Sequence, residues 1–559
     1  MSKIISRNRY YYLLIAFIGV AASVSASGLY LLYLNIWNPL LGFLQRQPVY
    51  YFLFAFIALV ASYAIVKLFA HTKTTGSGTH LVLERYHLSN GEISVRDTVT
   101  KAVASILTLG FGGSAGPEGP SLLVGGSIAS NVSRRLGIRV HNLRRVFIAG
   151  AAAGLAAVFR TPLTGILFAL EIPYRNDLDM ETFIEAMVAS IPSYLIAVLI
   201  LGSERIFGNP VQAQLSLMEI FLSLVLGLIC GVYAIFFTRV FSGAEQIRTS
   251  IRKKAGDISV LLLGTVILGV CGYFSIYSIG VGIHFVDAII NGTSFTVAMI
   301  LAIVLVKTLS TAITLNFGGS GGLFFPTIVI GAGIGFLFSS VTDANLKIVF
   351  AAVGMAALLS GTHKILLTPT AFVVETLGGV YAIPALLASG VSYLVSGNAS
   401  FYPIQPRTKL KAEELALEEF YAKAKMSFPD QLDRTLAASF MTKDPVSVYD
   451  GVTIKEAIEA FEKTTFRVLP VVDDYHRIVG VVTMEDLGNL NPGEIGGPLS
   501  ERLMLKPVVI TREASLKDIA ELMLKREEDH VFIVDENDRV IGTIAVIDVV
   551  RKIMELSTF

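Results

Sequence analysis

Two glycine-rich stretches decide the fold: Phe111–Pro120, which reads FGGSAGPEGP, and Phe317–Pro326, which reads FGGSGGLFFP. Aligned without gaps at an offset of 206 residues, they share the phenylalanine, three glycines, the serine and the final proline. Each lies among long apolar stretches, with no strand pattern and no phosphate-loop lysine nearby. The pair therefore indicates a repeated turn inside a membrane protein rather than a nucleotide-binding loop.

The repetition extends beyond these turns. Ala151–Ala157 (AAAGLAA) resembles Ala351–Ala357 (AAVGMAA), and each copy precedes an apolar segment that ends in a glutamate, Glu171 or Glu375. Residues 1–205 and 212–400 are therefore predicted to be two related halves. Matching broken helices in two halves favour a binding site where the repeats meet, as in transporters.

Composition supports a membrane-embedded body. The 559 residues are 53% hydrophobic and 16% charged, with a mean hydropathy of +0.65, whereas soluble domains are about a quarter charged. The overall charge of +1 hides a division: residues 1–410 carry a net +11 and residues 411–559 a net −10. We therefore predict an apolar membrane domain over 1–410, joined to an acidic soluble module.

Apolar stretches long enough to cross a bilayer recur along the first part. They span about 11–34, 49–70, 147–170, 183–202, 214–239, 258–279 and 294–315. Shorter or glycine-interrupted stretches span about 100–133, 321–341, 347–359, 364–376 and 380–397. A bilayer tolerates interrupted helices only where protein or a water-filled cavity surrounds them, so this pattern is typical of a channel or transporter.

A glycine-rich turn that enters a helix exposes backbone N–H groups at the positive end of the helix dipole. Such a turn binds an anion without a cationic side chain, weakly enough for release inside a membrane. Glu118 lies within the first turn, where its carboxylate could occupy the place of the anion and block it. Protonation would neutralise this carboxylate, so Glu118 is a candidate gate and proton carrier; the alternative is a helix-capping carboxylate.

With these motifs in place, the chain resembles the CLC family of chloride channels and chloride/proton antiporters. Gly76–His80 (GSGTH) resembles the family's GSGxP, Gly116–Pro120 (GPEGP) matches GxEGP, and Gly322–Pro326 (GLFFP) matches GxFxP. Tyr402, in the sequence SFYP, resembles the family's late tyrosine. The resemblance implies an α-helical polytopic membrane fold with broken helices and two inverted halves, assembled as a homodimer with a pore in each subunit.

The same resemblance implies roles for particular residues. The hydroxyls of Ser77 and Tyr402 would bind a central chloride, and the backbone amides of Leu323 and Phe324 would complete that site. Amides around Glu118 would form an outer anion site, and Glu118 itself would be the gating glutamate of a pH-dependent and voltage-dependent pathway. The outer-site amides are those of Gly116 and Gly119.

One position departs from many antiporters of the family. They carry an internal proton-passing glutamate directly after the residue that matches Glu171, but here that residue is Ile172. An aliphatic side chain binds no proton, so we predict a chloride channel or weakly proton-coupled transport. Some antiporters also lack this glutamate, and stoichiometric chloride/proton exchange therefore remains the alternative.

The acidic part holds a second repeat, at an offset of 62 residues. Leu469–Gly480 (LPVVDDYHRIVG) resembles Val531–Gly542 (VFIVDENDRVIG), and each copy has the strand, helix, strand, turn, strand, helix pattern of a CBS motif. We predict a helical connector over 411–430 and an α/β tandem CBS module over 431–559. Its copies span about 435–492 and 497–557.

Many adenosine-binding CBS motifs carry a hydroxyl residue for phosphate and an aspartate for ribose. The first copy has both, in Thr483 and Asp486, whereas the second has Ala545 in place of the hydroxyl and keeps Asp548. One site for ATP or AMP in the pair is therefore predicted; a purely structural dimerisation module is the alternative.

Other classes fit poorly. The sequence has no metal cluster, nucleophile–base pair or phosphate loop, so we predict no enzyme, no metal, no required cofactor and no nucleic-acid partner. A CBS-bearing cation transporter or a non-conducting membrane sensor are remote alternatives. We place the chain in the plasma (inner) membrane, with its basic N-terminus and its CBS module in the cytoplasm. Its partners are then the lipid bilayer, a second copy, chloride and protons.

Overall fold

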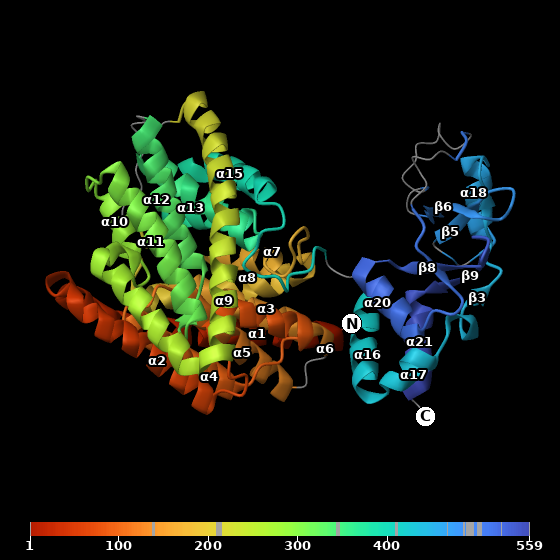
Figure 1. Cartoon of the computed structure of the whole chain (residues 1–559), viewed down its shortest axis with the longest axis horizontal. Coiled ribbons are helices and arrows are strands. Elements are labelled where there is room, and N and C mark those ends of the chain that lie inside the picture. Colours follow the sequence, from red (N-terminus) through yellow and green to blue (C-terminus); the bar gives the residue numbers. More distant parts are fainter. Residues whose placement is uncertain are drawn as a thin grey trace. The chain divides into compact units, whose positions relative to one another are not determined.

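The computed structural model of the chain divides into two compact units, Met1–Lys409 and Leu410–Phe559 (Figure 1). It describes residues 2–136, 140–207, 215–342, 347–408, 412–464, 466, 468–484, 487, 497–499, 506–526 and 528–557. The first unit is helical apart from two short strands, and the second is mixed α/β.

The first half of the helical unit starts with one long helix and continues through shorter ones. In order these are α1 (Ser2–Arg46), α2 (Tyr51–Phe69), α3 (Gly78–Leu88), α4 (Val95–Gly110), α5 (Glu118–Arg135), α6 (Val140–Phe159), α7 (Pro162–Glu171) and α8 (Phe183–Leu201). Strand β1 (Gly76–Ser77) precedes α3. Short 3₁₀ turns at Pro48–Tyr50 and Met180–Thr182 lead into α2 and α8.

The second half repeats this order. It consists of α9 (Leu217–Phe274), α10 (Ile283–Ile290), α11 (Val297–Asn316), β2 (Ser320–Gly321), α12 (Phe324–Thr342), α13 (Lys347–His363), α14 (Leu367–Thr376) and α15 (Ala382–Val395). Short 3₁₀ turns lie at Ile276–Ser278 and Gly379–Tyr381. Gly256 interrupts α9 with φ +80°, a conformation that glycine adopts without strain, so α9 is two helices joined at a kink. The sequence predicted these as separate stretches.

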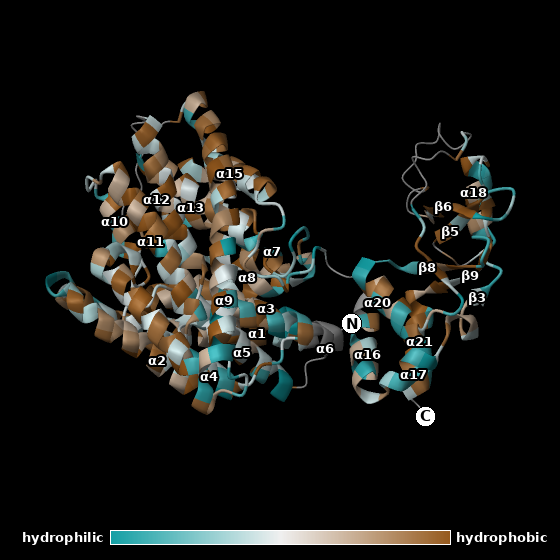
Figure 2. Ribbon diagram, in the orientation of Figure 1, coloured by the Kyte–Doolittle hydropathy of each residue, from teal (hydrophilic) through white to brown (hydrophobic). Residues whose placement is uncertain are grey.

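Six helical segments of the described chain are long and apolar enough to cross a membrane. They are Tyr10–Arg46, Pro48–Phe69, Met180–Leu201, Leu217–Phe274, Val297–Asn316 and Phe324–Thr342. Figure 2 shows mostly apolar residues along the helices of this unit, and large apolar side chains such as Leu199 and Leu217 are more than four-fifths exposed. An apolar exterior of this extent needs lipid or protein against it.

Hydrogen bonds exchanged between equivalent residues confirm two inverted halves. Thr108 Oγ1 accepts the Ser320 N–H at 2.9 Å, and Thr314 Oγ1 accepts the Ser114 N–H at 3.0 Å. Each threonine and each serine lies 206 residues from its equivalent. Such reciprocal bonds require a two-fold relation between the halves, with an axis near the glycine-rich turns.

The glutamates near the ends of α7 and α14 also form reciprocal hydrogen bonds, each with the start of the other helix. Glu171 accepts the N–H groups of Leu366, Leu367 and Thr368, at the start of α14, at 2.7–2.8 Å. Glu375 accepts the N–H groups of Leu163 and Thr164, at the start of α7, at 2.8 Å. Each carboxylate thus satisfies the free amides and faces the positive end of the partner helix.

The C-terminal unit contains two sheets. Its elements are α16 (Ala412–Ser427), α17 (Pro429–Arg434), β3 (Thr442–Lys443), β4 (Val448–Tyr449), α18 (Ile454–Glu462), β5 (Val468–Val472), β6 (Ile478–Thr483), β7 (Val509–Thr511), α20 (Leu516–Arg526), β8 (His530–Val534), β9 (Val540–Ala545) and α21 (Val546–Ser557). One sheet has the order β4-β5-β6 and the other β3-β9-β8-β7.

The two copies of the second repeat pack together. In each, a parallel strand pair (β4·β5, β7·β8) continues into an antiparallel pair (β5·β6, β8·β9). The equivalent turn residues His476 and Asp538 both adopt positive φ, at +65° and +59°. A small shared core contains Val472 and Val481 from one copy and Phe532 and Val540 from the other.

Candidate anion site

The three glycine-rich turns of the helical unit are joined by backbone hydrogen bonds. β1 pairs in parallel with β2, so that Ser77 lies opposite Gly321. Gly116 and Gly322, which are equivalent in the repeat, form an antiparallel bridge in which each N–H donates to the other's carbonyl, at 2.9 and 2.8 Å. The turns therefore form one rigid frame at the centre of the unit.

Glu118 lies in this frame and is fully buried. Its Oε1 accepts the Phe324 N–H at 2.7 Å and the Phe325 N–H at 3.4 Å, at the start of α12. A Cβ added to Gly116 or Gly322 would lie 1.9 Å from the Glu118 carboxylate. The absence of side chains at these two positions thus makes room for the carboxylate.

The carboxylate of Glu118 occupies an anion site made by the backbone. The first amides of α12 have no partner within their helix and point toward negative charge at the positive end of the helix dipole. Oε2 of Glu118 is buried and has no hydrogen-bond partner among the described residues. A free anion at the same place would meet the same two amide donors.

Two hydroxyl groups converge beside this frame. Tyr402 is fully buried, and its hydroxyl lies near those of Ser77 and Thr79. Within the described chain, Ser77 Oγ and Tyr402 OH are buried without a partner at normal hydrogen-bond geometry. Buried hydroxyls are usually satisfied, and these two are therefore available to a ligand.

The backbone donors differ in part from those predicted by the sequence. Gly116 was expected to offer its N–H to an anion, but that N–H donates to Gly322 and instead holds the frame together. The backbone of Gly119 packs closely against Gly321, and Leu323 directly precedes α12. Sequence reasoning named Phe324 and missed Phe325, whose amide is the second donor.

Two cavities approach the frame from different elements. One, here called the Pro117 cavity, has a volume of about 210 Å³. Its lining includes Pro117, Phe159, His284, Asp287 and Phe325.

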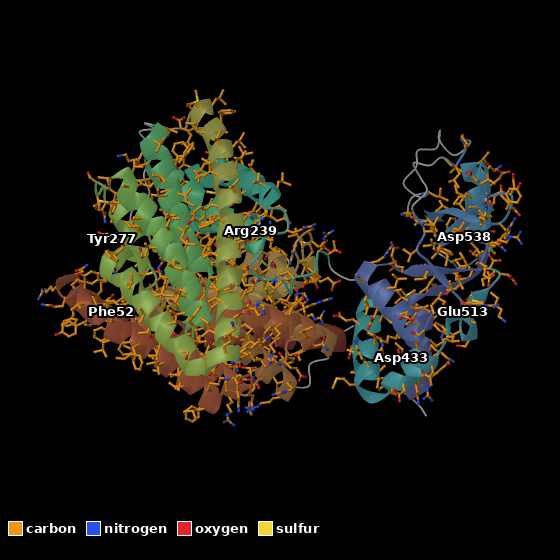
Figure 3. All side chains as sticks on the ribbon, viewed as in Figure 1. Phe52, Arg239, Tyr277, Asp433, Glu513 and Asp538 are labelled. Carbon is orange, nitrogen blue, oxygen red and sulfur yellow. The ribbon has the colours of Figure 1, made fainter. Side chains whose placement is uncertain are left out.

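The other, the Ser400 cavity, has a volume of about 420 Å³, and its lining includes Arg239, Asn398 and Ser400. The Arg239 side chain comes from α9 (Figure 3). Ser400 Oγ accepts the Tyr402 N–H at 3.0 Å, so a residue that lines this cavity contacts the backbone of Tyr402.

Family models match both units of the chain. The model described as "Voltage gated chloride channel" matches residues 54–397, and the CBS domain model matches residues 437–489 and 500–555. The chain belongs to the voltage-gated chloride channel (CLC) family. Tandem CBS domains follow its CLC domain.

Named relatives include both kinds of transport protein. The H(+)/Cl(-) exchange transporter ClcA of Vibrio campbellii is 26% identical over 327 residues, covering 56% of this chain and 69% of that protein. The chloride channel protein CLC-f of Arabidopsis thaliana is 27% identical over 474 residues, covering 75% of this chain and 60% of that protein.

Solved CLC structures share the fold. A CLC-type fluoride/proton antiporter superposes with a TM-score of 0.63 at 23% identity, over 71% of this chain and 97% of that one. A eukaryotic CLC transporter gives a TM-score of 0.60 at 17% identity, over 96% and 97% of the respective chains. The predicted CLC-like fold with a CBS module is confirmed.

In this CLC chain the coupling position carries no carboxylate. Ile172 follows α7 directly and is fully buried, and its carbonyl accepts the Gln405 side-chain N–H at 2.7 Å. The carboxylate of the neighbouring Glu171 accepts backbone hydrogen bonds at the start of α14. Among the described residues, no group of three or more His, Cys, Asp or Glu side chains could hold a metal ion.

The predicted nucleotide residues of the CBS domains are only partly described. Thr483 ends β6, and Asp486 lies outside the described residues. Asp548, in the first turn of α21, accepts the Ala545 N–H at 3.0 Å and lies 3.6 Å from Arg551. Asp548 therefore has a local helix-capping role, which a ribose would have to share.

Proposed function

We propose that this chain transports chloride across a membrane through a pathway within each subunit, with Glu118 as the gate. The observation that carries this proposal is the Glu118 carboxylate on the Phe324 and Phe325 amides. A carboxylate bound there excludes a chloride from the same donors. Protonation weakens its hold, because the hydrogen bonds become those of a neutral acceptor.

The second part of the proposal concerns the central site. The hydroxyls of Ser77 and Tyr402, with the backbone amides of Leu323 and Phe324, would bind an anion by partial charges alone, and the Gly119 amide would belong to the outer site. Weak binding of this kind suits conduction, since a lysine or arginine would hold chloride too tightly for rapid release. Arg239 in the Ser400 cavity would raise the local chloride concentration without touching the central site.

We propose a channel or weakly proton-coupled transport, because Ile172 cannot carry a proton. The alternative is stoichiometric chloride/proton exchange. The two are separated in liposomes by the reversal potential under opposed chloride and proton gradients. A potential that follows chloride alone supports the channel, whereas a stable shift with the proton gradient contradicts it and supports exchange.

The gate itself is tested by Glu118→Gln. The amide mimics the protonated side chain, so the pH dependence of chloride flux should largely disappear. Glu84→Gln, on the same unit and half-exposed, is the matched control and should leave the pH dependence unchanged. An unchanged pH profile in Glu118→Gln would remove this residue from gating.

The proposed assembly is a homodimer in the plasma (inner) membrane, with the N-terminus and the CBS module in the cytoplasm. Support comes from exposed leucines and isoleucines on α7, α8 and α15, which need lipid or a second copy to cover them. They are Leu163, Leu195, Leu199, Ile383 and Leu394. Light scattering of the detergent-solubilised protein measures the oligomeric state.

Binding of ATP or AMP by the CBS module is a second, separate proposal. It rests on Thr483 at the end of β6, at the position where nucleotide-binding CBS motifs place a hydroxyl. Titration of the full chain with each nucleotide, compared with Thr483→Ala, tests it. Equal heats from the two proteins, or none from either, would favour a structural dimerisation module.

Purified protein in liposomes also separates the remote alternatives. A non-conducting sensor gives no ion flux, and a cation transporter gives flux that depends on the cation rather than on chloride. Chloride flux with impermeant cations on both sides would contradict both.

A further inference from the structure

His363, the last residue of α13, is fully buried next to the anion site. Its ring centroid lies 5.3 Å from that of Tyr402, 5.6 Å from that of Phe401 and 6.0 Å from that of Phe324. Phe324 supplies the amide that holds Glu118, and Tyr402 supplies a hydroxyl of the predicted central site. The imidazole therefore packs against residues of both parts of the pathway.

The hydrogen bonds of His363 fix its neutral tautomer. Nδ1 lies 2.9 Å from Thr362 Oγ1, and the Leu359 carbonyl also accepts from the imidazole. The Thr362 hydroxyl donates its own hydrogen to the Leu358 carbonyl at 2.9 Å, so its oxygen accepts from the ring. A carbonyl can only accept, and Nδ1 therefore carries the hydrogen. Nε2 is left with a bare lone pair.

This Nε2 atom is buried and has no hydrogen-bond partner among the described residues. Ser77 Oγ, Tyr402 OH and Glu118 Oε2 share this property. The four groups are neighbours: the Tyr402 hydroxyl lies near the Ser77 hydroxyl and within electrostatic range of Glu118, and the Tyr402 ring packs on His363. A lone pair that faces an anion site repels the anion, whereas an N–H there would attract it.

The repeat shows that packing alone does not require a histidine here. Phe159 is the equivalent of His363, 204 residues earlier, and both rings pack against Phe324, at 5.3 and 6.0 Å. Each is followed by a residue with positive φ, Arg160 at +54° and Lys364 at +57°. A phenyl ring fills the position in the first half, and the imidazole adds a proton acceptor in the second.

His363 also lies close to the missing coupling carboxylate. The Gln405 side-chain amide donates to the Ile172 carbonyl at 2.7 Å and to the His363 carbonyl at 3.3 Å. One side chain thus bridges the two positions. The link runs through the backbone carbonyls of Ile172 and His363.

The other ionisable groups around His363 are engaged elsewhere. Lys364 donates to Ser396 Oγ at 2.6 Å and to the Tyr393 carbonyl at 3.3 Å. Glu171 binds the start of α14, and Glu118 binds the Phe324 amide. Tyr402 is the ionisable side chain whose ring faces the imidazole.

We propose that His363 is a second proton-binding site of the pathway, linked to the anion at Ser77 and Tyr402. Nε2 takes up a proton when chloride binds, and the imidazolium and the anion then offset each other's burial. The N–H bond that forms supplies a donor toward the anion, and the proton leaves when chloride leaves. This inference rests on the proposed chloride site and adds a base that sequence motifs do not assign.

Thermodynamic linkage makes the proposal measurable. If chloride binding takes up one proton, the apparent chloride affinity weakens by up to about tenfold for each pH unit, over the pH range in which the chloride-bound imidazole keeps its proton and the chloride-free imidazole lacks it. Glu118 also binds protons, so the measurement is made in the full chain carrying Glu118→Gln. Calorimetric chloride titrations between pH 5 and 8, in two buffers of different ionisation enthalpy, give the affinity and the protons taken up.

In this background His363→Phe and His363→Gln should abolish proton uptake and make the chloride affinity independent of pH. The phenylalanine keeps the packing seen at Phe159, and the glutamine keeps a polar group. If one variant does not fold, the other still tests the proposal. His87→Gln is the matched control, because His87 Nε2 already contacts the Pro173 carbonyl at 2.9 Å. Uptake should persist in that variant.

Proton uptake that survives both His363 variants, or chloride binding without any uptake in the Glu118→Gln background, would overturn the proposal. Failure of the proposed function is a different result, since the wild-type chain would then show neither chloride flux nor chloride binding.

Discussion

The two glycine-rich turns have the same residue at six of ten positions, but only the first carries a carboxylate. Gly116 and Gly322 pair with each other across the two-fold axis, but Glu118 in the first turn corresponds to Phe324 in the second. The carboxylate of one half binds the amide of its own counterpart in the other half, at 2.7 Å. Both halves thus build the frame, whereas the carboxylate that we propose as its gate belongs to the first half alone.

Other pairs of equivalent residues also fall into two groups, those that are alike in both halves and those that differ. Glu171 and Glu375, and likewise Thr108 and Thr314, make the same bonds in both halves and hold the scaffold. Phe159 and His363 fill the same position with different chemistry. The comparison indicates that bonds kept in both halves serve stability, and that differences between them locate the function.

The largest expected effect comes from the exchanged carboxylates. Glu171→Gln leaves an amide N–H₂ facing backbone N–H donors and removes a charge from the start of α14, so we expect a loss of about 3 kcal/mol of stability. Glu375→Gln should cost less, because Leu163 at its site is exposed. Chemical denaturation in detergent measures both. If Glu171→Gln left the stability unchanged, the hydrogen bonds of Glu171 would not be what holds the two halves together.

A second effect tests the room made by glycine. In Gly322→Ala the new Cβ would lie 1.9 Å from Glu118 Oε1 and displace the carboxylate from the Phe324 amide. Since a hydrogen bond to a charged group contributes about 1.5–3 kcal/mol, we expect chloride flux at neutral pH to rise at least roughly tenfold. Gly390→Ala, which meets nothing within 4 Å, is the control. A flux equal to that of the wild type would mean that the backbone shifts to accept the new Cβ. The space left by Gly322 would then not be needed to hold the Glu118 carboxylate.

A smaller effect concerns the exchanged threonines. Thr108→Val and Thr314→Val each leave one buried amide, of Ser320 or Ser114, without its acceptor, at a cost of about 1–2 kcal/mol. Equivalent positions should lose similar amounts, as measured by thermal unfolding. Thr249→Val, an exposed hydroxyl bonded within α9, should be near neutral. If the two losses of stability differed by more than about 1 kcal/mol, the net contribution of one hydrogen bond, the two threonine sites would not be equivalent.

The smallest effect lies in the second repeat. Hydrogen bonds from the Ser515 side chain and backbone lower the pKa of the Asp518 carboxyl at the start of α20. A carboxyl with a lowered pKa stabilises the fold above its unfolded pKa, and this contribution disappears as the pH falls through the folded value. Asp518→Asn should therefore cost about 0.5–1 kcal/mol at pH 7 and nothing near pH 2. Hydrogen exchange of the α20 amides reads this out.

Glu456→Gln, at the equivalent cap of α18, is the companion variant, since Thr453 and Glu456 form the same box. A loss in one copy without the other would mean that the two CBS copies have diverged in stability as the membrane halves have in chemistry.

Much of the fold and part of the site could be predicted from the sequence. The repeated turns, the broken helices and Glu118 are visible because glycine, proline and an intramembrane carboxylate have few structural roles. Gly116 was misassigned because a letter does not reveal whether an N–H faces a ligand or another strand. The Phe325 amide was missed for the same reason, since backbone donors are independent of side-chain identity.

His363 was missed for a different reason: it lies in none of the motifs, and its neighbours Phe324, Phe401 and Tyr402 are distant from it along the chain. The signal was nevertheless present as a departure from the repeat, at an offset of 204 residues from Phe159. Aligned on Glu171 and Glu375, which have this same offset, the two halves pair the polar His363 with the aromatic Phe159.

The exchange of glutamates also has a consequence for biosynthesis. The carboxylate of Glu171 finds its amides only 195 residues later in the chain. At about 5–20 residues per second, a ribosome takes roughly 10–40 s to supply them. During that interval Glu171 lacks the amides that it binds in the folded chain, and the start of α7 lacks Glu375. The first half therefore reaches its final hydrogen bonding only after most of the second half has been made.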